Sequence, residues 1–508
     1  MSQFMIPFFR ILIIGCLASL TMTSGVYAQD KILRMPVISL PPTLGNPYGA
    51  NGLPSALVWF SLYDPLVRTN EQGVLEAALA LSWEAIEPTR WRFKLREGVT
   101  FSNGEPFDAR AASFVLSWLM QDEARGLIVA NEVQGISGIE VIDDFTLDVI
   151  TREPDAILPK RLTAVQMLAP KALAEQGITE FARRPAGTGP FEVVSWNDGG
   201  KAVTRARHAS WRPPMIDGIH FYQIPDETTL VQALQSGQVD LTTTLTPDAA
   251  FDMEGNGFYV SVSKTAQVLS FAFNLEGTSV EALHDPRVRL AMNLAVDRQA
   301  IADIVLHGTT TPANQPGTPL TFGYNPDLPP ISYDPERARN LLTEAGYPNG
   351  FFVRADAVTA GNANASLIFQ LVQQGLRGIG VDMELRSIVF SEWLRQYTTG
   401  TWEVDLFSLA FNSEPYYDVI RPMEYYSCAK PVPFFCHEVL MSSLNATGAE
   451  FNAEKRHSML QGLSKTYREM APAIYILEVS EVAVIADHVR NYRVRTRVPV
   501  YEALEIER

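Results

Sequence analysis

The segment 410–418, Ala-Phe-Asn-Ser-Glu-Pro-Tyr-Tyr-Asp, concentrates side chains that could hold a small polar solute. It follows the largely apolar run 404–409, which is typical of a strand. A carboxylate that faces an ammonium group in a closed cleft forms a charge-assisted hydrogen bond of roughly 1.5–3 kcal/mol. The alternative is a solvated loop with an aromatic anchor. We predict ligand contacts from Asn412, Glu414, Tyr416, Tyr417 and Asp418.

Other candidate contacts are scattered along the chain. The Pro/Gly-rich loop 44–48 follows the first predicted strand, and we predict contacts from Asn46 and Tyr48, against the alternative of plain turn residues. Arg354, beside the loop 355–365, could counter a ligand carboxylate. The aromatic residues Trp393 and Trp402 could stack on a ligand, although core packing is the better-supported alternative for both.

Sequence patterns for covalent or metal chemistry are missing. There is no G-x-S-x-G motif and no P-loop, and the segment 187–192 lacks the third glycine of a dinucleotide loop. His437-Glu438 begins like a zinc-protease motif, but Met441 stands where the second histidine belongs. We therefore predict no catalytic residue, no metal and no cofactor. An unmarked carboxylate pair keeps a secreted hydrolase open as an alternative.

Size and charge exclude some classes of protein. A chain of 508 residues is too long for one core and is expected to form two or three lobes. Hydrophobic residues make up 46% and charged residues 19%, which is typical of a globular protein. The net charge of -16, with no basic run longer than Arg183-Arg184, argues against a nucleic-acid partner.

The first residues have the pattern of an export signal. Arg10 precedes the apolar run 11–20, and the small residues Val26 and Ala28 suggest cleavage before Gln29. We therefore predict a signal peptide over residues 1–28 and a periplasmic location. An uncleaved N-terminal anchor is the alternative. The apolar stretch before Cys16 is short for a lipobox, so we do not expect a lipid anchor there.

Two cysteines, Cys428 and Cys436, remain in the exported chain. An even pair in an oxidising compartment predicts one disulfide that closes a short loop, and two free buried thiols are the alternative.

Strand and helix signals alternate along the chain. Residues 91–95 alternate apolar and polar side chains, and 139–149 has apolar residues on both sides of a turn. Apolar positions from 111 to 119 have helical spacing. Asp285 and Asp334 each precede a proline, as helix N-caps do. Further helix–strand pairs are expected at 228–237 with 239–241 and at 368–379 with 381–385. This order indicates α/β lobes with mixed sheets.

A series of short blocks also runs through the mature chain in a fixed order. The blocks are 81–83 with 91–107, 187–191, 211–221, 233–240, Asn274 with 285–289, Ala291, 297–298, and 333–335 with 341–342. In this order they resemble the family 5 extracellular solute-binding proteins, the dipeptide, oligopeptide and nickel-binding group of ABC importers. Each block alone is weak evidence for this resemblance, but the ordered series is specific to the family and covers nearly all of the mature chain. The aromatic residues of the blocks suit a hydrophobic core, so we interpret the blocks as structural scaffold rather than as ligand contacts.

The resemblance implies an α/β, two-lobed periplasmic-binding-protein-like fold with mixed sheets, a hinge and an extra subdomain on the first lobe. By the order of the blocks, lobe I would comprise 29–58, 187–273 and 478–508, the subdomain 59–186, and lobe II 274–477. Crossings near 273–274 and 476–478 would form a hinge that lets the lobes close on a ligand.

The resemblance also bears on the segment 410–418. In peptide-binding relatives this loop resembles an Asp-Pro-Asp pattern, from which a carboxylate meets the amino terminus of the peptide. Here Glu414 precedes the proline, Tyr416 stands at the second acidic position, and Asp418 lies two residues further on. This departure leaves the role of each carboxylate open.

The expected function is therefore reversible capture of a small polar solute by a monomer that delivers it to an inner-membrane ABC permease. A short peptide ranks first because Glu414 and Asp418 suit a cationic end. A small oligosaccharide, an opine-like conjugate or a metal chelate are alternatives within this class. A secreted hydrolase and a periplasmic chaperone are the alternatives outside it.

Overall fold

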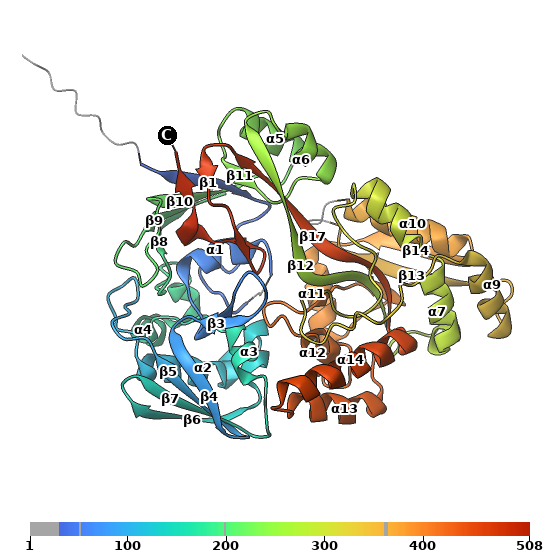
Figure 1. Cartoon of the computed structure of the whole chain (residues 1–508), viewed down its shortest axis with the longest axis horizontal. Coiled ribbons are helices and arrows are strands. Elements are labelled where there is room, and N and C mark those ends of the chain that lie inside the picture. Colours follow the sequence, from blue (N-terminus) through green and yellow to red (C-terminus); the bar gives the residue numbers. More distant parts are fainter. Residues whose placement is uncertain (1–29, 50–51, 198–199, 360–363, 508) are drawn as a thin grey trace, which may run out of the picture. The chain divides into compact units, whose positions relative to one another are not determined.

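Two long strands, β12 (Phe258–Phe273) and β17 (Ala473–Ala486), run side by side through the middle of the molecule (Figure 1). They pair antiparallel from Phe258 opposite Ala486 to Ala272 opposite Ala473, and the register shifts between Lys264 and Val268. The computed structural model describes residues 30–49, 52–197, 200–359 and 364–507. The predicted signal peptide, 1–28, and Cys16 lie outside the described residues.

These two strands belong to a seven-stranded mixed sheet with the order β11-β17-β12-β15-β13-β14, in which β16 also pairs with β12. Strand β13 runs parallel to β14 and β15, whereas β12 is antiparallel to β15, β16 and β17. The other strands are β11 (Leu241–Thr242), β13 (Phe351–Ala357), β14 (Val381–Ser387), β15 (Leu406–Ser408) and β16 (Phe411–Asn412). Around the part of the sheet nearest β14 lie α7 (Pro286–Leu294), α8 (Arg298–Ala300), α9 (Pro335–Glu344) and α10 (Ala365–Arg377).

Two further four-stranded sheets form the other side of the molecule, with the orders β1-β10-β9-β8 and β4-β5-β7-β6. The first contains β1 (Ile32–Val37), β8 (Phe191–Asn197), β9 (Lys201–Ala206) and β10 (Gly218–Gln223). The second contains β4 (Ala80–Glu87), β5 (Arg90–Leu95), β6 (Ile136–Asp143) and β7 (Thr146–Thr151). The helices on this side are α1 (Ser55–Leu62), α2 (Ala109–Leu119), the 3-10 helix η2 (Ile128–Val133), α3 (Leu158–Arg161) and α4 (Pro170–Phe181). Helices α5 (Glu227–Gln235) and α6 (Pro247–Met253) pack against β12 and β17 of the seven-stranded sheet.

The remaining elements lie mostly in the last quarter of the chain. The helices are α11 (Phe390–Thr399), α12 (Ile420–Tyr425), α13 (Glu438–Gly448) and α14 (Ala453–Met470). Short strand pairs are β2 (Val67–Thr69) with β3 (Leu75–Ala77), β18 (Val489–Arg490) with β21 (Glu505–Ile506), and β19 (Val494–Arg495) with β20 (Val498–Pro499). No helix within the described ranges has the length and apolar character needed to cross a bilayer.

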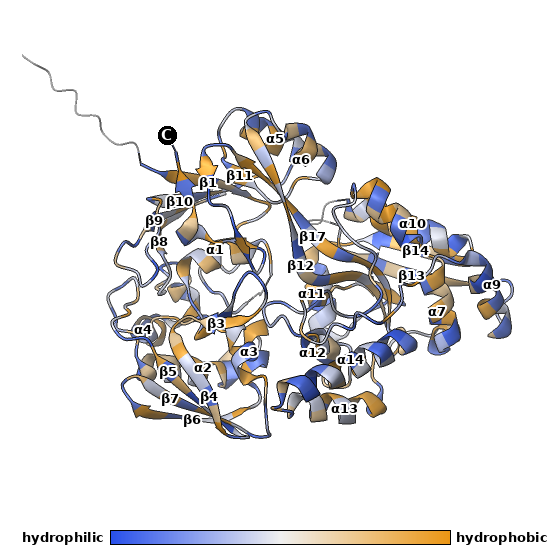
Figure 2. Ribbon diagram, in the orientation of Figure 1, coloured by the Kyte–Doolittle hydropathy of each residue, from blue (hydrophilic) through white to orange (hydrophobic). Residues whose placement is uncertain are grey.

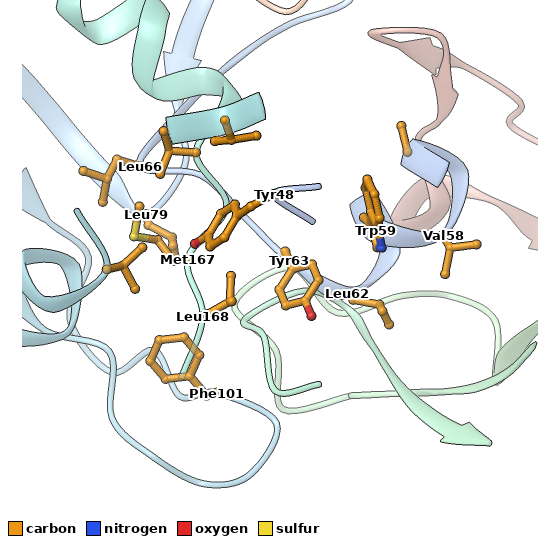
Figure 3. Packing of buried hydrophobic residues seen from close by; sticks show 14 of the residues in the cluster. Tyr48, Val58, Trp59, Leu62, Tyr63, Leu66, Leu79, Phe101, Met167 and Leu168 are labelled. Atoms are coloured by element: carbon orange, nitrogen blue, oxygen red, sulfur yellow. The ribbon is translucent and has the colours of Figure 1, made fainter. Parts of the chain in front are cut away.

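Buried apolar side chains separate into cores that β12 and β17 connect. The first core combines residues from 33 to 221 with Ala483, Ile485 and the C-terminal segment, and part of it is shown in Figure 3. Phe271 and Phe273 of β12 pack in a second core with residues from 282 to 383. Residues from the predicted subdomain 59–186 share the first core with residues predicted for lobe I. Residues 31–508 form one compact unit.

The local patterns in the sequence predict most elements correctly. The strand at 91–95, the hairpin at 139–149 and the helix at 111–119 are β5, β6–β7 and α2. Both predicted N-caps are confirmed, because the Asp285 and Asp334 carboxylates accept hydrogen bonds from Arg287 N and Arg337 N at 2.8 Å. Helix α10 carries hydrophobic and hydrophilic colours along its length in Figure 2, as its predicted apolar stripe requires.

The predicted disulfide is confirmed. Cys428 and Cys436 are bonded, with their Cα atoms 4.4 Å apart, and the bridge closes the loop that follows α12.

Truncation of β12 in the second core should destabilise the fold. Phe271 is fully buried, and its ring lies 4.7 Å from that of Phe369. We expect Phe271→Ala to lower the free energy of unfolding by about 3–5 kcal/mol, because it removes buried contacts and leaves a cavity. Phe352→Ala on β13 is the matched control, since Phe352 is 46% exposed. Chemical denaturation of both variants measures the difference, and equal losses would contradict this account of the core.

Candidate functional site

A cleft of about 1390 Å³ lies where the long strands pass between the two sides of the molecule. One side contributes residues of α1 and η2, and the other contributes residues of α10, α11 and α12. Between them lie Gln267 and Leu269 of β12 and residues 477–482 of β17. A cleft of this kind, lined from both sides and floored by the connecting strands, can enclose a small molecule.

Helix α11 gives the cleft an aromatic wall. Phe390, Trp393 and Tyr397 lie on one helical face, with centroid distances of 5.7 Å from Phe390 to Trp393 and 5.0 Å from Trp393 to Tyr397. The Trp393 indole N–H donates to Ser408 O at 2.8 Å, which fixes the ring. Trp393 therefore lines the cleft, as the sequence predicts for a stacking surface.

Of the ligand contacts predicted in segment 410–418, Asn412 and Glu414 line cavity space. Asn412 lines the cleft, and both residues line a small adjoining cavity of about 50 Å³. Glu414 is 5% exposed, and its carboxylate accepts hydrogen bonds from Ala266 N at 3.1 Å and from Gln267 Nε2 at 2.9 Å. Gln166 lines the same small cavity, and its buried Oε1 has no hydrogen-bond partner among the described residues.

A buried ion pair borders both spaces. Arg497 lines the cleft and the small cavity, and its Nε donates to Glu481 Oε1 at 2.9 Å. Burial raises the pKa of Glu481 to about 7, with a smaller raising contribution from Glu414 and an opposing one from Arg497. Arg497 adopts a positive φ of 64° in the turn between β19 and β20.

Arg421 and Tyr425 of α12 also line the cleft, and the sequence analysis did not identify them. Arg421 lies three residues beyond segment 410–418, at the start of the next helix. This closeness to the predicted site is the feature of the sequence that could have identified it. No local pattern pointed to Gln166, Glu481 or Arg497, which reach the site from distant parts of the chain.

The structure does not bring Asn46 and Tyr48 to the cleft. Tyr48 is fully buried in the first core near Tyr63 and Met167 (Figure 3). Its hydroxyl donates to Gln166 O at 2.6 Å, and its backbone N–H donates to Asn46 Oδ1 at 3.0 Å. The loop 44–48 is therefore a packed turn, which was the alternative interpretation.

Trp402 and Arg354 also lie away from the cleft. Trp402 stacks on Phe407 at 3.8 Å between ring centroids and is buried in a core, again the alternative interpretation. Arg354 on β13 is exposed, and its Nε donates to Glu384 Oε2 of the neighbouring strand at 3.3 Å.

The other predicted contacts in segment 410–418 point into the protein. Tyr416 is buried and donates its hydroxyl to Glu132 Oε2, and Tyr417 is also buried. Asp418 is completely buried and accepts hydrogen bonds from Lys160 Nζ at 2.7 Å and from Arg456 NH1 and NH2 at 2.7 and 3.0 Å. Both carboxylate oxygens are therefore occupied, and the pKa of Asp418 lies well below its usual range despite burial.

The contacts of Asp418 are part of a polar bridge between segment 155–161 and the α12–α14 region. Arg161 donates to Glu424 Oε1 at 2.7 Å and to Glu424 Oε2 at 3.0 Å. Ala156 N donates to Gly448 O at 2.8 Å. These groups join the two sides of the molecule through hydrogen bonds and ion pairs.

The described ranges contain no group of three or more His, Cys, Asp or Glu side chains that could hold a metal ion.

Comparison with known proteins gives consistent matches over most of the chain. A model of bacterial extracellular solute-binding proteins, family 5 middle region, matches residues 74–428. The glutathione-binding protein GsiB of Shigella dysenteriae serotype 1 is 28% identical over 380 residues, which cover 74% of this chain and 72% of the relative.

Solved structures match over the whole described fold. Helicobacter pylori DppA, a periplasmic binding protein in complex with the peptide STSA, matches with a TM-score of 0.81 at 21% identity, over 94% of this chain and 98% of that one. Staphylococcus aureus NikA in complex with Ni(L-His)2 matches with a TM-score of 0.79 at 20% identity, over 94% and 100%. These likenesses show the two-lobed α/β fold that the sequence predicts.

Removal of the Asp418 charge should destabilise the fold. We expect Asp418→Asn to lower the free energy of unfolding by about 3–5 kcal/mol, because Lys160 and Arg456 then remain buried without their counter-ion. Since the folded-state pKa of Asp418 is depressed, its contribution is complete above about pH 4 and is lost as the pH falls further. Asp122→Asn, which breaks the exposed pair with Arg125, is the control. Similar stabilities of both variants at pH 7 would contradict this role.

Glu481 should make the free energy of unfolding depend on pH in the direction opposite to that expected for Asp418. Its raised pKa means that the protonated form favours folding, so this contribution is complete below about pH 4 and is lost as the pH rises through about 7. We expect the free energy of unfolding of the wild type, relative to Glu481→Gln, to fall by up to about 3 kcal/mol between pH 5 and pH 8. Denaturation at several pH values measures this change, with the exposed Glu403→Gln as control. A constant difference would refute it.

Proposed function

The chain belongs to family 5 of the bacterial extracellular solute-binding proteins, and we propose that it captures a short peptide or peptide-like solute. Members of this family bind solutes and deliver them to ABC permeases. The observation that carries the proposal is the large cleft, whose adjoining cavity holds a buried carboxylate and an unpartnered buried acceptor. In this proposal the protein acts as a monomer without catalysing a reaction, and the permease lies in the inner membrane.

The amino terminus of the solute binds in the small cavity beside Glu414. An ammonium group carries three donors and needs acceptors around it. Glu414, Gln166 and Gln267 line one cavity, and the buried Gln166 Oε1 has no hydrogen-bond partner among the described residues. This keeps the predicted amine-binding role for Glu414 and drops it for Asp418. The Asp418 carboxylate lines neither cavity and already accepts four hydrogen bonds, whereas that of Glu414 accepts two.

The remainder of the solute lies along the aromatic wall of α11. Phe390 is 54% exposed, and Trp393 and Tyr397 continue its stack, so the wall offers apolar area at little cost in side-chain entropy. Such a wall tolerates several side chains, which suits a peptide. The relative GsiB is named for glutathione, itself a short peptide, and this supports the same solute class.

Closure on the solute bends β12 and β17 where their register is irregular. We place the crossing between Lys264 and Val268 of β12, opposite 478–480 of β17. This crossing lies a few residues before the 273–274 boundary that the sequence suggests, because Val268, Phe271 and Phe273 pack mostly with residues of the predicted lobe II. Lobe I would then comprise 29–58, 187–264 and 480–508, with the subdomain at 59–186.

Export by a cleaved signal peptide over residues 1–28 places the protein in the periplasm. This location suits the disulfide between Cys428 and Cys436, because such bonds persist in oxidising compartments.

Neutralisation of Glu414 should weaken the capture of peptides that carry a free amine. We expect Glu414→Gln to raise the Kd for the tripeptide Glu-Ala-Gly roughly 10- to 100-fold, since a charge-assisted hydrogen bond is lost. Isothermal titration calorimetry measures Kd, and N-acetyl-Glu-Ala-Gly should bind wild type and variant equally weakly.

Glu403→Gln is the matched control, because Glu403 is an exposed glutamate on the same stretch of chain. Equal affinity of the Glu414 variant and the wild type for the free peptide would refute the amine cavity. A wild type that binds no free or acetylated peptide would refute peptide capture.

A further inference from the structure

Lys430 places a cation beside the aromatic wall of α11. Its Nζ lies 4.5 Å from the centroid of the Tyr397 ring and donates to Tyr397 O at 2.9 Å and to Val432 O at 2.6 Å. Burial lowers the pKa of Lys430 to about 8, and no carboxylate in the described part of the chain offsets this effect. The protein thus holds a lysine charge in its cleft without supplying a counter-ion.

The ammonium group of Lys430 keeps one donor for a ligand. It carries three N–H donors, and the two backbone carbonyls occupy two of them. Lys430 lines the cleft and is half-buried, and its hydrogen bond to Val432 O lies in an exposed position. A carboxylate that enters the cleft can therefore reach this ammonium group and form a charge-assisted hydrogen bond with it.

The disulfide loop holds Lys430 against the aromatic wall. Cys428 and Cys436 close this loop, and Lys430 and Val432 within it both line the cleft. Val432 packs against Gly400 at the end of α11, where a Cβ atom would overlap Val432 Cγ1. The lysine and the aromatic rings are therefore positioned together before a ligand arrives, as recognition of two parts of one ligand residue requires.

The other cations that line the described part of the cleft are paired or exposed. The arginines paired with carboxylates are Arg125, Arg421 and Arg497, and Arg152 is exposed. Lys430 is therefore the cation of this lining that is withdrawn from water and still lacks a carboxylate. A carboxylate on the solute would supply the missing charge.

We propose that Lys430 binds the C-terminal carboxylate of the solute, and that the side chain of its last residue is apolar and packs on Trp393 and Tyr397. The role that the sequence suggested for Arg354 passes to Lys430, because Arg354 lies away from the cleft. This inference rests on the proposed capture of a peptide-like solute. It adds a second anchor to the amine cavity at Glu414 and narrows the solute to peptides with a free C-terminus and an apolar last residue.

Peptides with a free or an amidated C-terminus test this subsite. Ala-Phe, Ala-Ala-Phe and Ala-Ala-Ala-Phe are compared with their C-terminal amides by isothermal titration calorimetry at pH 7, so that three lengths are sampled. We expect the wild type to bind the free acid of at least one length roughly 10- to 100-fold more tightly than its amide, the effect of one hydrogen bond between charged groups. Replacement of Phe by Gly in that peptide should weaken binding roughly 10-fold or more, because apolar area of the wall is left uncovered.

Lys430→Met should raise the Kd of the preferred free acid roughly 10- to 100-fold and change that of its amide less than about threefold. Lys430→Arg retains the charge and should keep the preference, which a merely structural role would not predict. Lys430→Gln retains donors for the two backbone carbonyls, and it keeps the test decisive if the methionine variant fails to fold. Arg152→Met is the matched control, because Arg152 also lines the cleft but is exposed, and it should leave the preference unchanged.

The outcomes separate this inference from the proposed function. Three results would overturn the C-terminal subsite and leave peptide capture intact. They are equal binding of acid and amide at every length, equal affinity for the Phe and Gly peptides, and an undiminished preference in folded Lys430→Met or Lys430→Gln. Binding of none of these peptides by the wild type would overturn both.

Discussion

The antiparallel pairing of β12 with β17 is the constraint on which the site depends. Each strand supplies side chains to cores on both sides of the molecule, and each lines the cleft between them. Backbone hydrogen bonds hold the two strands in one register. A shift of that register by one residue would turn the side chains that pack in the cores outward, so the register is strongly specified. The register shift near Lys264 interrupts the ladder at the cleft.

Charge is distributed in two different ways around that cleft. In the walls, buried ions meet opposite charges from distant parts of the chain, as Asp418 meets Lys160 and Arg456. Such pairing offsets the cost of removing charges from water. Two buried polar atoms of residues that line these spaces, Gln166 Oε1 and Arg421 Nε, have no hydrogen-bond partner among the described residues.

Segment 410–418 shows how far composition can identify a site. Its position after a strand placed it correctly beside the cleft, and Asn412 and Glu414 face cavity space. Composition could not tell which of its carboxylates and tyrosines would turn inward. That was decided by partners hundreds of positions away in sequence, such as Glu132 for Tyr416 and Lys160 for Asp418. Arg421, just beyond the segment, is buried against the rings of Tyr416 and Tyr425, which its position in a helix did not indicate.

The sequence by itself determined the elements and the fold class, because periodicity, N-caps such as Asp285 and turn residues act over a few neighbouring positions. It also predicted the disulfide, since Cys428 and Cys436 are the only cysteines beyond the predicted export signal. The tertiary structure alone decided that Trp393 faces the cleft while Trp402 lies in a core, and which charges are paired. Those outcomes depend on contacts between segments far apart in the chain, and no local spacing encodes them.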